Sequence, residues 1–411
     1  MDQIQETYWA WLCSCPLLYR TSIGALIRYF GSPQAVFEAQ DSELKLWKRT
    51  LGQSSLKWFI SLLHFREACT PQETAESLQK LNISFISRSH PLFPDKLLAI
   101  PDCPWGLFYR GHLPDPSLPS AAIVGARRCS NYGIQVASSI SHDLTDCGFQ
   151  IISGMAVGVD GTAQSECVSR GGSSFALLGC GIDICYPPEH SRLYRTLPEN
   201  GGIISEFPPG TPPEKMHFPM RNRLIAGLSD AVIVVEAREK SGSLITADMA
   251  LDQGKDVFAV PGRYNDRLSF GCNRLIEQGA SIIVSAQSLL ENLELSLGRK
   301  LIPALPHESD VRSAEENPPD KTSFPAPPCV FNSPSEEAGE ETSDSCIPAF
   351  FSSLSPLQQT VYRALDLHGK SAENIALEAK LTISDTMSSL VSMQLNGQVR
   401  ELSRCRYARV L

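Results

Sequence analysis

The segment 231-AVIVVEAREKSGSLITADMA-250 decides the fold class. Residues 231–236 form a short apolar run that predicts a buried strand. Ser241-Gly242-Ser243 then stands at the start of a helical pattern, where a serine can cap free backbone N–H groups. A strand that leads through a short polar loop into a helix is the repeating unit of α/β folds. The start of such a helix suits a phosphate, because N–H groups and partial positive charge meet there.

The same alternation extends over residues 120–286 and predicts a Rossmann-like, doubly wound, mainly parallel sheet. Each predicted strand is followed by a turn rich in Gly, Ser or Pro. The predicted strands are 121–125, 150–153, 175–178, 202–205, 231–236, 257–260 and 281–284. In such sheets, ligands bind beyond the carboxyl ends of the strands. We therefore expect the functional site at that edge.

Glycines, small polar residues and arginines gather after the predicted strands. Gly125 and Arg127 follow the first strand, 153-SGMAVGVDGTA-163 follows the second and 179-GCGIDICYP-187 the third. Glycine lets backbone N–H groups approach an anion, and Thr246 adds a hydroxyl near the Ser-Gly-Ser helix start. Other residues in these segments are expected to shape the loops, with the carboxylates accepting backbone N–H bonds. These loop-structuring residues are Gly154, Gly158, Asp160, Gly179, Gly181 and Asp183.

The segment 215-KMHFPMRNRLIAGLS-229 is cationic and carries one aromatic side chain. Lys215, Arg221 and Arg223 surround Phe218, and Asn222 is expected to structure the loop. An exposed aromatic face can stack on an unpaired base while nearby cations contact phosphates. The two segments together predict a protein that binds single-stranded nucleic acid.

The sequence does not assemble a catalytic or metal-binding set. The acids near the predicted site stand singly, the thirteen cysteines include no C-x-x-C pair, and the glycines do not match G-x-G-x-x-G. We therefore expect no metal, no cofactor and no enzyme activity. The cysteines are expected to be reduced thiols.

The net charge of −9 is concentrated outside the predicted sheet. Ten acids against Arg312 and Lys321 give the segment 307–346 a charge of −8, so the rest of the chain is nearly neutral. Overall acidity is therefore compatible with a local cationic site. No apolar run has the ~20 residues that a membrane span needs, and the start lacks the positive region of a signal peptide. We expect a soluble, cytoplasmic protein without membrane contact.

Five regions are predicted along the chain. Residues 1–80 read as a helical domain similar to sterile-alpha-motif or helix-hairpin-helix units, with Gly31 ending one helix and Ser32-Pro33 opening the next. Residues 81–119 form a proline-rich connector with an edge strand near 104–111. The sheet domain spans 120–300, and a Pro, Ser and Glu-rich linker spans 301–349. Residues 350–411 predict three helices and a hairpin, as in a winged helix.

The central region closely resembles the DprA/Smf family of bacterial DNA-processing proteins. The matching segments cover about 165 residues in the family's order. They are 124-VGARRCSNYG-133, 153-SGMAVGVDGTAQ-164, 179-GCGIDICYP-187, 205-SEFPPG-210, 219-PMRNRLIAGLS-229, 234-VVEAREKSGSLITADMA-250 and 258-FAVPG-262. Cys129 departs from the family, which often has proline there.

The resemblance implies binding of single-stranded DNA, dimerisation, and loading of RecA recombinase during natural transformation. It assigns DNA contact to Gly125, Arg127, Lys215, Phe218, Ser241, Gly242, Ser243 and Thr246. Arg221 and Arg223 match the family's Arg-Asn-Arg, which either contacts DNA or supports the loop.

The alternative function is a nucleotide hydrolase of the lysine-decarboxylase-like Rossmann group. Those enzymes resemble P-G-G-x-G-T-x-x-E at the matching loop, where a carboxylate acts on the sugar. Here Met249 stands where the glutamate would fall, and Asp248 is the adjacent acid.

Overall fold

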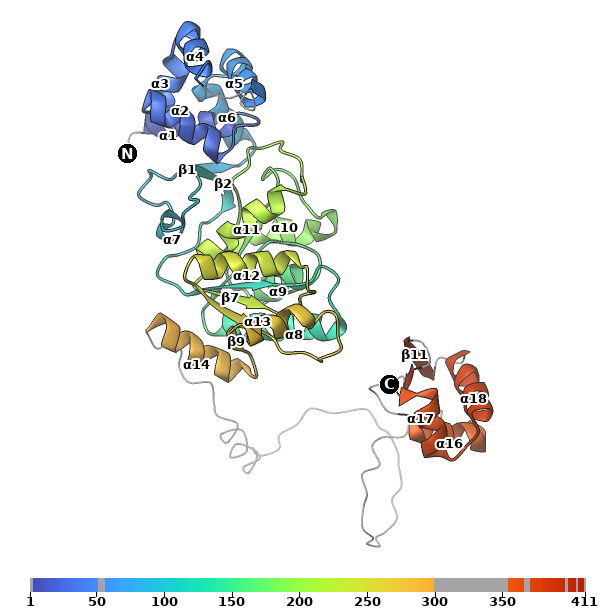
Figure 1. Cartoon of the computed structure of the whole chain (residues 1–411). Helices are drawn as coiled ribbons and strands as arrows, with labels where there is room; N and C mark the ends of the chain where they lie inside the picture. The colour runs from blue at the N-terminus through green and yellow to red at the C-terminus, as the bar shows by residue number, and fades with distance from the viewer. Residues whose placement is uncertain are drawn as a thin grey trace, which may run out of the picture. The chain divides into compact units, whose positions relative to one another are not determined.

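The computed structural model describes residues 3–50, 56–298, 354–365, 370–395, 398–403 and 406–409. The chain forms two compact units, Met1–Pro318 and Pro319–Leu411 (Figure 1). The predicted linker 301–349 lies outside the described residues. The finer domain boundaries proposed from the sequence stay predictions.

The larger unit begins with helices whose ends carry the expected signals. Helix α2 (Arg20–Phe30) ends at Gly31, which has a left-handed φ of 84°. The Ser32 side chain accepts the N–H of Ala35, and Pro33 opens α3 (Pro33–Glu38). The predicted helix end at Gly31 and helix start at Ser32-Pro33 are thus confirmed. The other helices here are α1 (Gln3–Ser14), α4 (Asp41–Lys48), α5 (Leu56–Ala68) and α6 (Pro71–Lys80).

A nine-stranded, mainly parallel sheet with the order β1-β2-β6-β5-β4-β3-β7-β8-β9 follows. All seven strands predicted within 120–286 are confirmed, each within about two residues. The strands are β1 (Ser84–Ser87), β2 (Gly106–Gly111), β3 (Ser120–Val124), β4 (Gln150–Ser153), β5 (Ser174–Leu178), β6 (Gly202–Ser205), β7 (Ala231–Val234), β8 (Asp256–Ala259) and β9 (Ser281–Ile282). From β6 to β9 every neighbouring pair is parallel.

The strand predicted near 104–111 exists as β2, but its expected place at the edge of the sheet is wrong. β2 pairs antiparallel with β6 on one side and with β1 on the other. β1 was missed because it has only four residues, and a sequence in which Ser87 is buried while Phe85 is partly exposed gives no clear apolar alternation. The segment between the helical region and β3 therefore extends the sheet by two strands.

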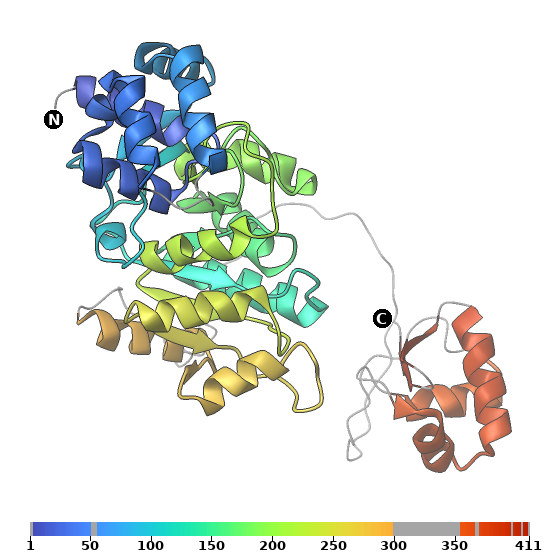
Figure 2. The same cartoon turned by 45° about the horizontal axis from the view of Figure 1, so that its top comes forward.

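Helices cover both faces of the sheet, as Figures 1 and 2 show. One face packs against α11, α12 and α13 and the other against α8, α9 and α14, because successive strand residues point to opposite sides. Ala122 and Val124 of β3 lie in the first core, and Ala121 and Ile123 lie in the second. The helices are α7 (Asp95–Leu98), α8 (Asn131–Asp146), α9 (Val159–Ser169), α10 (Ser191–Asn200), α11 (His217–Leu228), α12 (Gly242–Asp252), α13 (Phe270–Glu277) and α14 (Ala286–Leu297).

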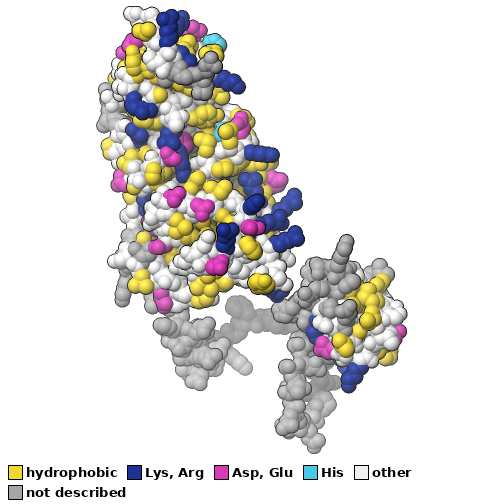
Figure 3. Space-filling model, viewed as in Figure 1, with side chains coloured by type: hydrophobic (Ala, Val, Ile, Leu, Met, Phe, Trp, Pro, Cys, Tyr) yellow, Lys and Arg dark blue, Asp and Glu magenta, His cyan; other side chains and the backbone are white. Residues whose placement is uncertain are grey.

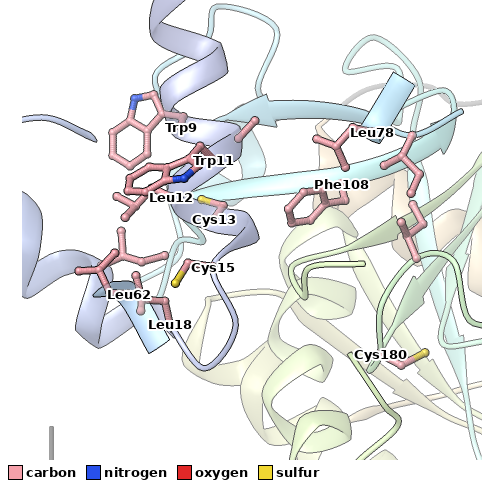
Figure 4. Packing of buried hydrophobic residues seen from close by; sticks show 14 of the residues in the cluster. Trp9, Trp11, Leu12, Cys13, Cys15, Leu18, Leu62, Leu78, Phe108 and Cys180 are labelled. Atoms are coloured by element: carbon pink, nitrogen blue, oxygen red, sulfur yellow. The ribbon is translucent and has the colours of Figure 1, made fainter. Parts of the chain in front are cut away.

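A third core joins the N-terminal helices to the antiparallel edge of the sheet. Trp9, Leu12 and Cys13 of α1 belong to the same buried cluster as Phe108 of β2 and Leu78 of α6 (Figure 4). Phe108 is fully buried. The helical region is therefore packed against the sheet through β2.

The smaller unit contains three helices and a three-stranded antiparallel sheet with the order β10-β12-β11 among the residues described in it. Ser355 caps the first helix, and the terminal hairpin is present as predicted. The elements are α16 (Pro356–Ala364), β10 (Lys370–Ser371), α17 (Ala372–Ala379), α18 (Ile383–Leu395), β11 (Val399–Ser403) and β12 (Arg406–Arg409).

The Phe108→Ala substitution is expected to lower the free energy of unfolding of the larger unit by about 3–5 kcal/mol, because it empties a fully buried site. Leu92→Ala is the matched control: Leu92 is 75% exposed in the same segment and should change stability by less than about 0.5 kcal/mol. Urea unfolding followed by circular dichroism measures both. If the two variants unfolded at the same urea concentration, the burial of β2 within the sheet would be contradicted.

Candidate functional site

A cavity of about 750 Å³ opens at the carboxyl ends of β3 and β7. The strand order reverses between these two strands, since β4 to β6 lie on one side of β3 and β7 to β9 on the other. Crevices at such switch points are the usual ligand sites of open α/β sheets. Nine of the ten predicted contact residues line the cavity: Gly125, Arg127, Lys215, Phe218, Arg221, Ser241, Gly242, Ser243 and Thr246.

An arginine and two aromatic rings form one wall of the cavity. The guanidinium carbon of the exposed Arg127 lies 5.1 Å from the centre of the Phe218 ring. The Tyr186 ring lies 5.5 Å from that ring, tilted by 40°. Phe218 is half-buried, with Gly179 so close beneath it that a Cβ there would lie 2.9 Å from its Cδ1 atom. Phe218 is thus held in place while part of its ring remains accessible.

The N-terminus of α12 forms a second wall. Ser241 is the N-cap, and its side chain accepts the N–H of Ser243 at 3.4 Å. The hydroxyl groups of Ser241 and Ser243 lie 2.7 Å apart. Asn222 donates its side-chain N–H to the Gly242 carbonyl, which fixes this helix start against α11. An anion placed here would meet the positive end of the helix dipole and the two serine hydroxyls.

Arg221 lies beneath the cavity and is only 4% exposed. Its Nη1 atom donates to the carbonyls of Gly154 and Leu177, so it joins the ends of β4 and β5. Asp160 is also buried and accepts the N–H of Gly154 at 3.1 Å. Burial raises the pKa of Asp160 and lowers the pKa of Arg221 to about 10, while their mutual attraction opposes both shifts.

Arg223 lies outside the large cavity. Its side chain is buried and pairs with Glu206 at 2.6 Å. It faces a smaller cavity of about 280 Å³ between α1, α2 and the sheet. Burial raises the pKa of Glu206, and the Arg223 charge opposes that shift. Of the two arginines predicted in this segment, Arg221 therefore lies below the large cavity and Arg223 faces the helical region.

The remaining loop residues hold backbone turns. Both carboxylate oxygens of Asp183 accept the N–H of Gly210, and the N–H of Gly181 donates to the Thr211 carbonyl. Gly158 has a φ of 90°, and a Cβ there would lie 2.3 Å from the Ala126 carbonyl oxygen. The loop after β4 therefore rests directly on the backbone beside Arg127.

Five exposed cations border the cavity: Arg127, Arg128, Lys215, Arg238 and Lys240. Among the described residues, none of them has an ion-pair partner within 4.0 Å. Figure 3 shows Lys and Arg side chains projecting along one edge of the larger unit. Of the acids in the described part of the chain, only the buried Asp160 lines the cavity. The cavity is therefore electropositive although the chain is acidic.

Sequence reasoning missed Arg128, Tyr186, Arg238 and Lys240 as site residues. Arg238 and Lys240 directly precede the Ser-Gly-Ser segment, and Tyr186 ends the segment after β5, so a search of all residues beyond the strand ends would have included them. Over the part of the chain that the structure describes, no group of three His, Cys, Asp or Glu side chains could hold a metal. The ten cysteines described are free thiols, and no described helix is long and apolar enough to span a membrane.

The sequence matches a protein family and several relatives. Residues 84–294, from the start of β1 into α14, match the family of the DNA recombination-mediator protein A. The protein Smf of Synechocystis is 31% identical over 386 residues, covering 92% of this chain and 90% of that protein. The DNA processing protein DprA of Streptococcus pneumoniae is 42% identical over 202 residues, covering 49% of this chain and 71% of that protein.

A solved structure supports the same relationship. The X-ray structure of DprA from Streptococcus pneumoniae has a TM-score of 0.58 and 32% identity, and the match covers 69% of this chain and 97% of that chain. Because one relative aligns with nine-tenths of the sequence and the family match spans the whole parallel sheet, this chain belongs to the DprA/Smf family of DNA-processing, recombination-mediator proteins.

Proposed function

We propose that the cavity at the β3–β7 switch point binds single-stranded DNA without breaking a bond. The observation that carries this proposal is the combination of five exposed cations with an accessible aromatic ring around one helix N-terminus. Arg127, Lys215 and the Ser241-Gly242-Ser243 segment would hold phosphates, and Phe218 would stack on a base. The family's role in DNA processing and recombination supports a DNA ligand.

A single strand fits this cavity better than a duplex. Stacking on Phe218 requires an unpaired base, because the faces of paired bases are covered within a duplex. A duplex reader would present a helix or ribbon with side chains that reach base edges in a groove. Here the cations and the ring instead line a concave cavity.

Arg221 and Arg223 are proposed to support the site rather than to contact DNA. Arg221 donates hydrogen bonds to two backbone carbonyls, and Arg223 donates to the Glu206 carboxylate. Breaking either arrangement would leave buried polar groups without partners, which costs more than a phosphate contact at the surface gains. Their charges can still strengthen the local positive potential.

We further propose, from the family resemblance, that the protein forms a homodimer in the cytoplasm and passes the bound strand to RecA recombinase in natural transformation. The smaller unit is proposed to be a winged helix that contacts protein, because 382-TISDTMSSLVSMQLN-396 contains no Lys or Arg. A helix that binds in a DNA groove typically carries cationic side chains that contact the phosphates.

The nucleotide hydrolase is the weaker candidate. Asp248 lines a neighbouring cavity and not the one that contains Arg127 and Phe218. Met249 holds the position of the expected glutamate. Release of base from a nucleoside monophosphate that Asp248→Ala abolishes would favour the enzyme over the binding protein.

The first functional prediction concerns Arg127 and Phe218. Fluorescence anisotropy with a labelled oligo-dT should show binding that weakens with salt, with a log–log slope of about −3 to −4 if all five cations contact phosphates. Arg127→Ala should make the slope less negative by about 0.7. Phe218→Ala should cost about 1–3 kcal/mol of binding free energy and leave the slope nearly unchanged.

Lys57→Ala is the matched control for charge, since Lys57 is exposed on α5 in the helical region. This variant should bind like the wild type. A wild type that ignores single strands, or an Arg127→Ala Phe218→Ala double variant that binds equally well, would contradict the site. Unlabelled duplex should displace the strand poorly.

The phosphate site depends on the loop after β4. A methyl group on Gly158 would collide with the carbonyl oxygens of Ala126 at 2.3 Å and Arg127 at 2.7 Å. The N–H of Val159 also donates to the Ala126 carbonyl. The position of the Arg127 backbone is therefore coupled to the conformation at Gly158.

Gly158→Ala should therefore lower both stability, by about 1–3 kcal/mol, and affinity for oligo-dT. Gly171→Ala is the matched control: Gly171 also has a positive φ, of 75°, but nothing lies within 4 Å of an added Cβ. It should lose some stability and no affinity. Urea unfolding and anisotropy measure the two effects, and normal DNA binding by folded Gly158→Ala would remove the proposed coupling.

A further inference from the structure

The loop between β8 and α13 carries a second group of exposed aromatic and cationic residues. Within 263-RYNDRLSF-270, Tyr264 is 96% exposed and Phe270 is 47% exposed. Arg263 and Arg267 are also exposed and have no ion-pair partner within 4.0 Å among the residues described. This alternation of arginine and aromatic residues is similar to the residue composition of the large cavity.

The loop is anchored although its tip is exposed. The Asn273 side chain donates to the Gly262 carbonyl and accepts the Gly262 N–H, both at 3.1 Å. The Leu268 carbonyl accepts the N–H of Ala237 at 2.7 Å, next to Arg238 of the cavity. The carboxylate of Asp266 accepts from the Leu268 N–H and the Ser269 hydroxyl inside the loop. Asp266 therefore stabilises the turn, and Arg263 and Arg267 remain free to contact a ligand.

The topology places this loop beside the proposed DNA site. β8 runs parallel to β7, so the loops after both strands lie at the same edge of the sheet. A second cavity of about 510 Å³ shares Lys240, Ser241 and Gly242 with the first and reaches Gly271 and Arg274 of α13. In Figures 1 and 2 the loop, in gold, extends from the sheet next to α13. The second cavity, whose lining also includes the acids Glu239 and Asp248, thus extends from the α12 N-terminus to Gly271, the residue that follows the loop.

We propose that this loop is a second contact site for the same single strand, an inference that rests on the proposed DNA-binding function. The strand leaves the first cavity over Ser241-Gly242 and crosses the second cavity. Tyr264 then stacks on a further base, and Arg263 and Arg267 contact the adjacent phosphates. The ligand is a strand longer than the first cavity holds, so the site adds affinity for long strands only.

Exposure of the ring argues for a ligand with a flat face. A tyrosine exposed to 96% gains almost nothing from packing in the free protein, and its ring is accessible on both faces. Arginine and tyrosine are also common at protein interfaces. A strand is favoured here because Arg263 and Arg267 of the loop lie at the same edge of the sheet as Arg238 and Lys240. Lys240 and Arg274 offset the charges of Glu239 and Asp248 in the second cavity.

The experiment compares oligo-dT of about 4 and about 16 nucleotides, the range of single-strand sites. In the full chain, Tyr264→Ala should bind the short strand like the wild type and the long strand about five-fold or more weakly, the loss of one stacked base. Tyr264→Phe keeps the ring and should bind both strands like the wild type. Arg263→Ala Arg267→Ala should make the salt slope less negative for the long strand alone.

A second measurement detects the contact directly. A long oligo-dT with a single photoreactive 5-iodouridine, moved along the strand, should cross-link to Tyr264 at one end and to Phe218 further along. An unchanged affinity of Tyr264→Ala for the long strand, or an equal loss for both strands, overturns the second site. The first outcome assigns the loop to a protein contact. A wild type that binds neither strand would instead refute the proposed function itself.

Discussion

The cavity at the carboxyl ends of β3 and β7 depends on the hydrogen bonds that the buried Arg221 side chain makes. This side chain joins the ends of β4 and β5 through the Gly154 and Leu177 carbonyls, close to the buried Asp160. A buried charge is costly to hold, so burial lowers the pKa of Arg221 although the attraction of Asp160 opposes that shift. The loop after β4 is thereby fixed, and Gly158 transmits that position to the backbone beside Arg127.

The switch point explains why distant segments of the chain meet at one edge. Strands β3 and β7 are neighbours in the sheet although more than a hundred residues separate them. Arg127 follows the first of these strands and the α12 N-terminus follows the second, while α11 brings Phe218 across the gap. Each loop alone would bind a phosphate weakly. Their convergence gives one cavity in which phosphate and base contacts can act on the same ligand.

Most of the parallel sheet could be predicted because its strands are short apolar runs separated by helices. The meeting of the loops at one edge could be predicted because the strands are parallel, and nine predicted contact residues line one cavity there. Burial could not be predicted: Arg223 reads as a surface cation in sequence, yet it pairs with Glu206 against the helical region. Tyr264 was overlooked because irregular loops have no periodicity from which exposure can be inferred.

The arginines at this edge divide into two classes that residue type alone does not distinguish. Arg221 and Arg223 are buried: Arg221 donates to backbone carbonyls, and Arg223 donates to the Glu206 carboxylate through Nη2 while its Nη1 has no partner. Arg127 and Arg238 remain exposed without ion-pair partners among the described residues, so they can exchange water and counterions for phosphates. The buried class makes the site rigid, and the exposed class makes it electropositive. Because the hydrogen bonds of Arg221 already position the loops, the proposed strand would lose less conformational entropy on binding.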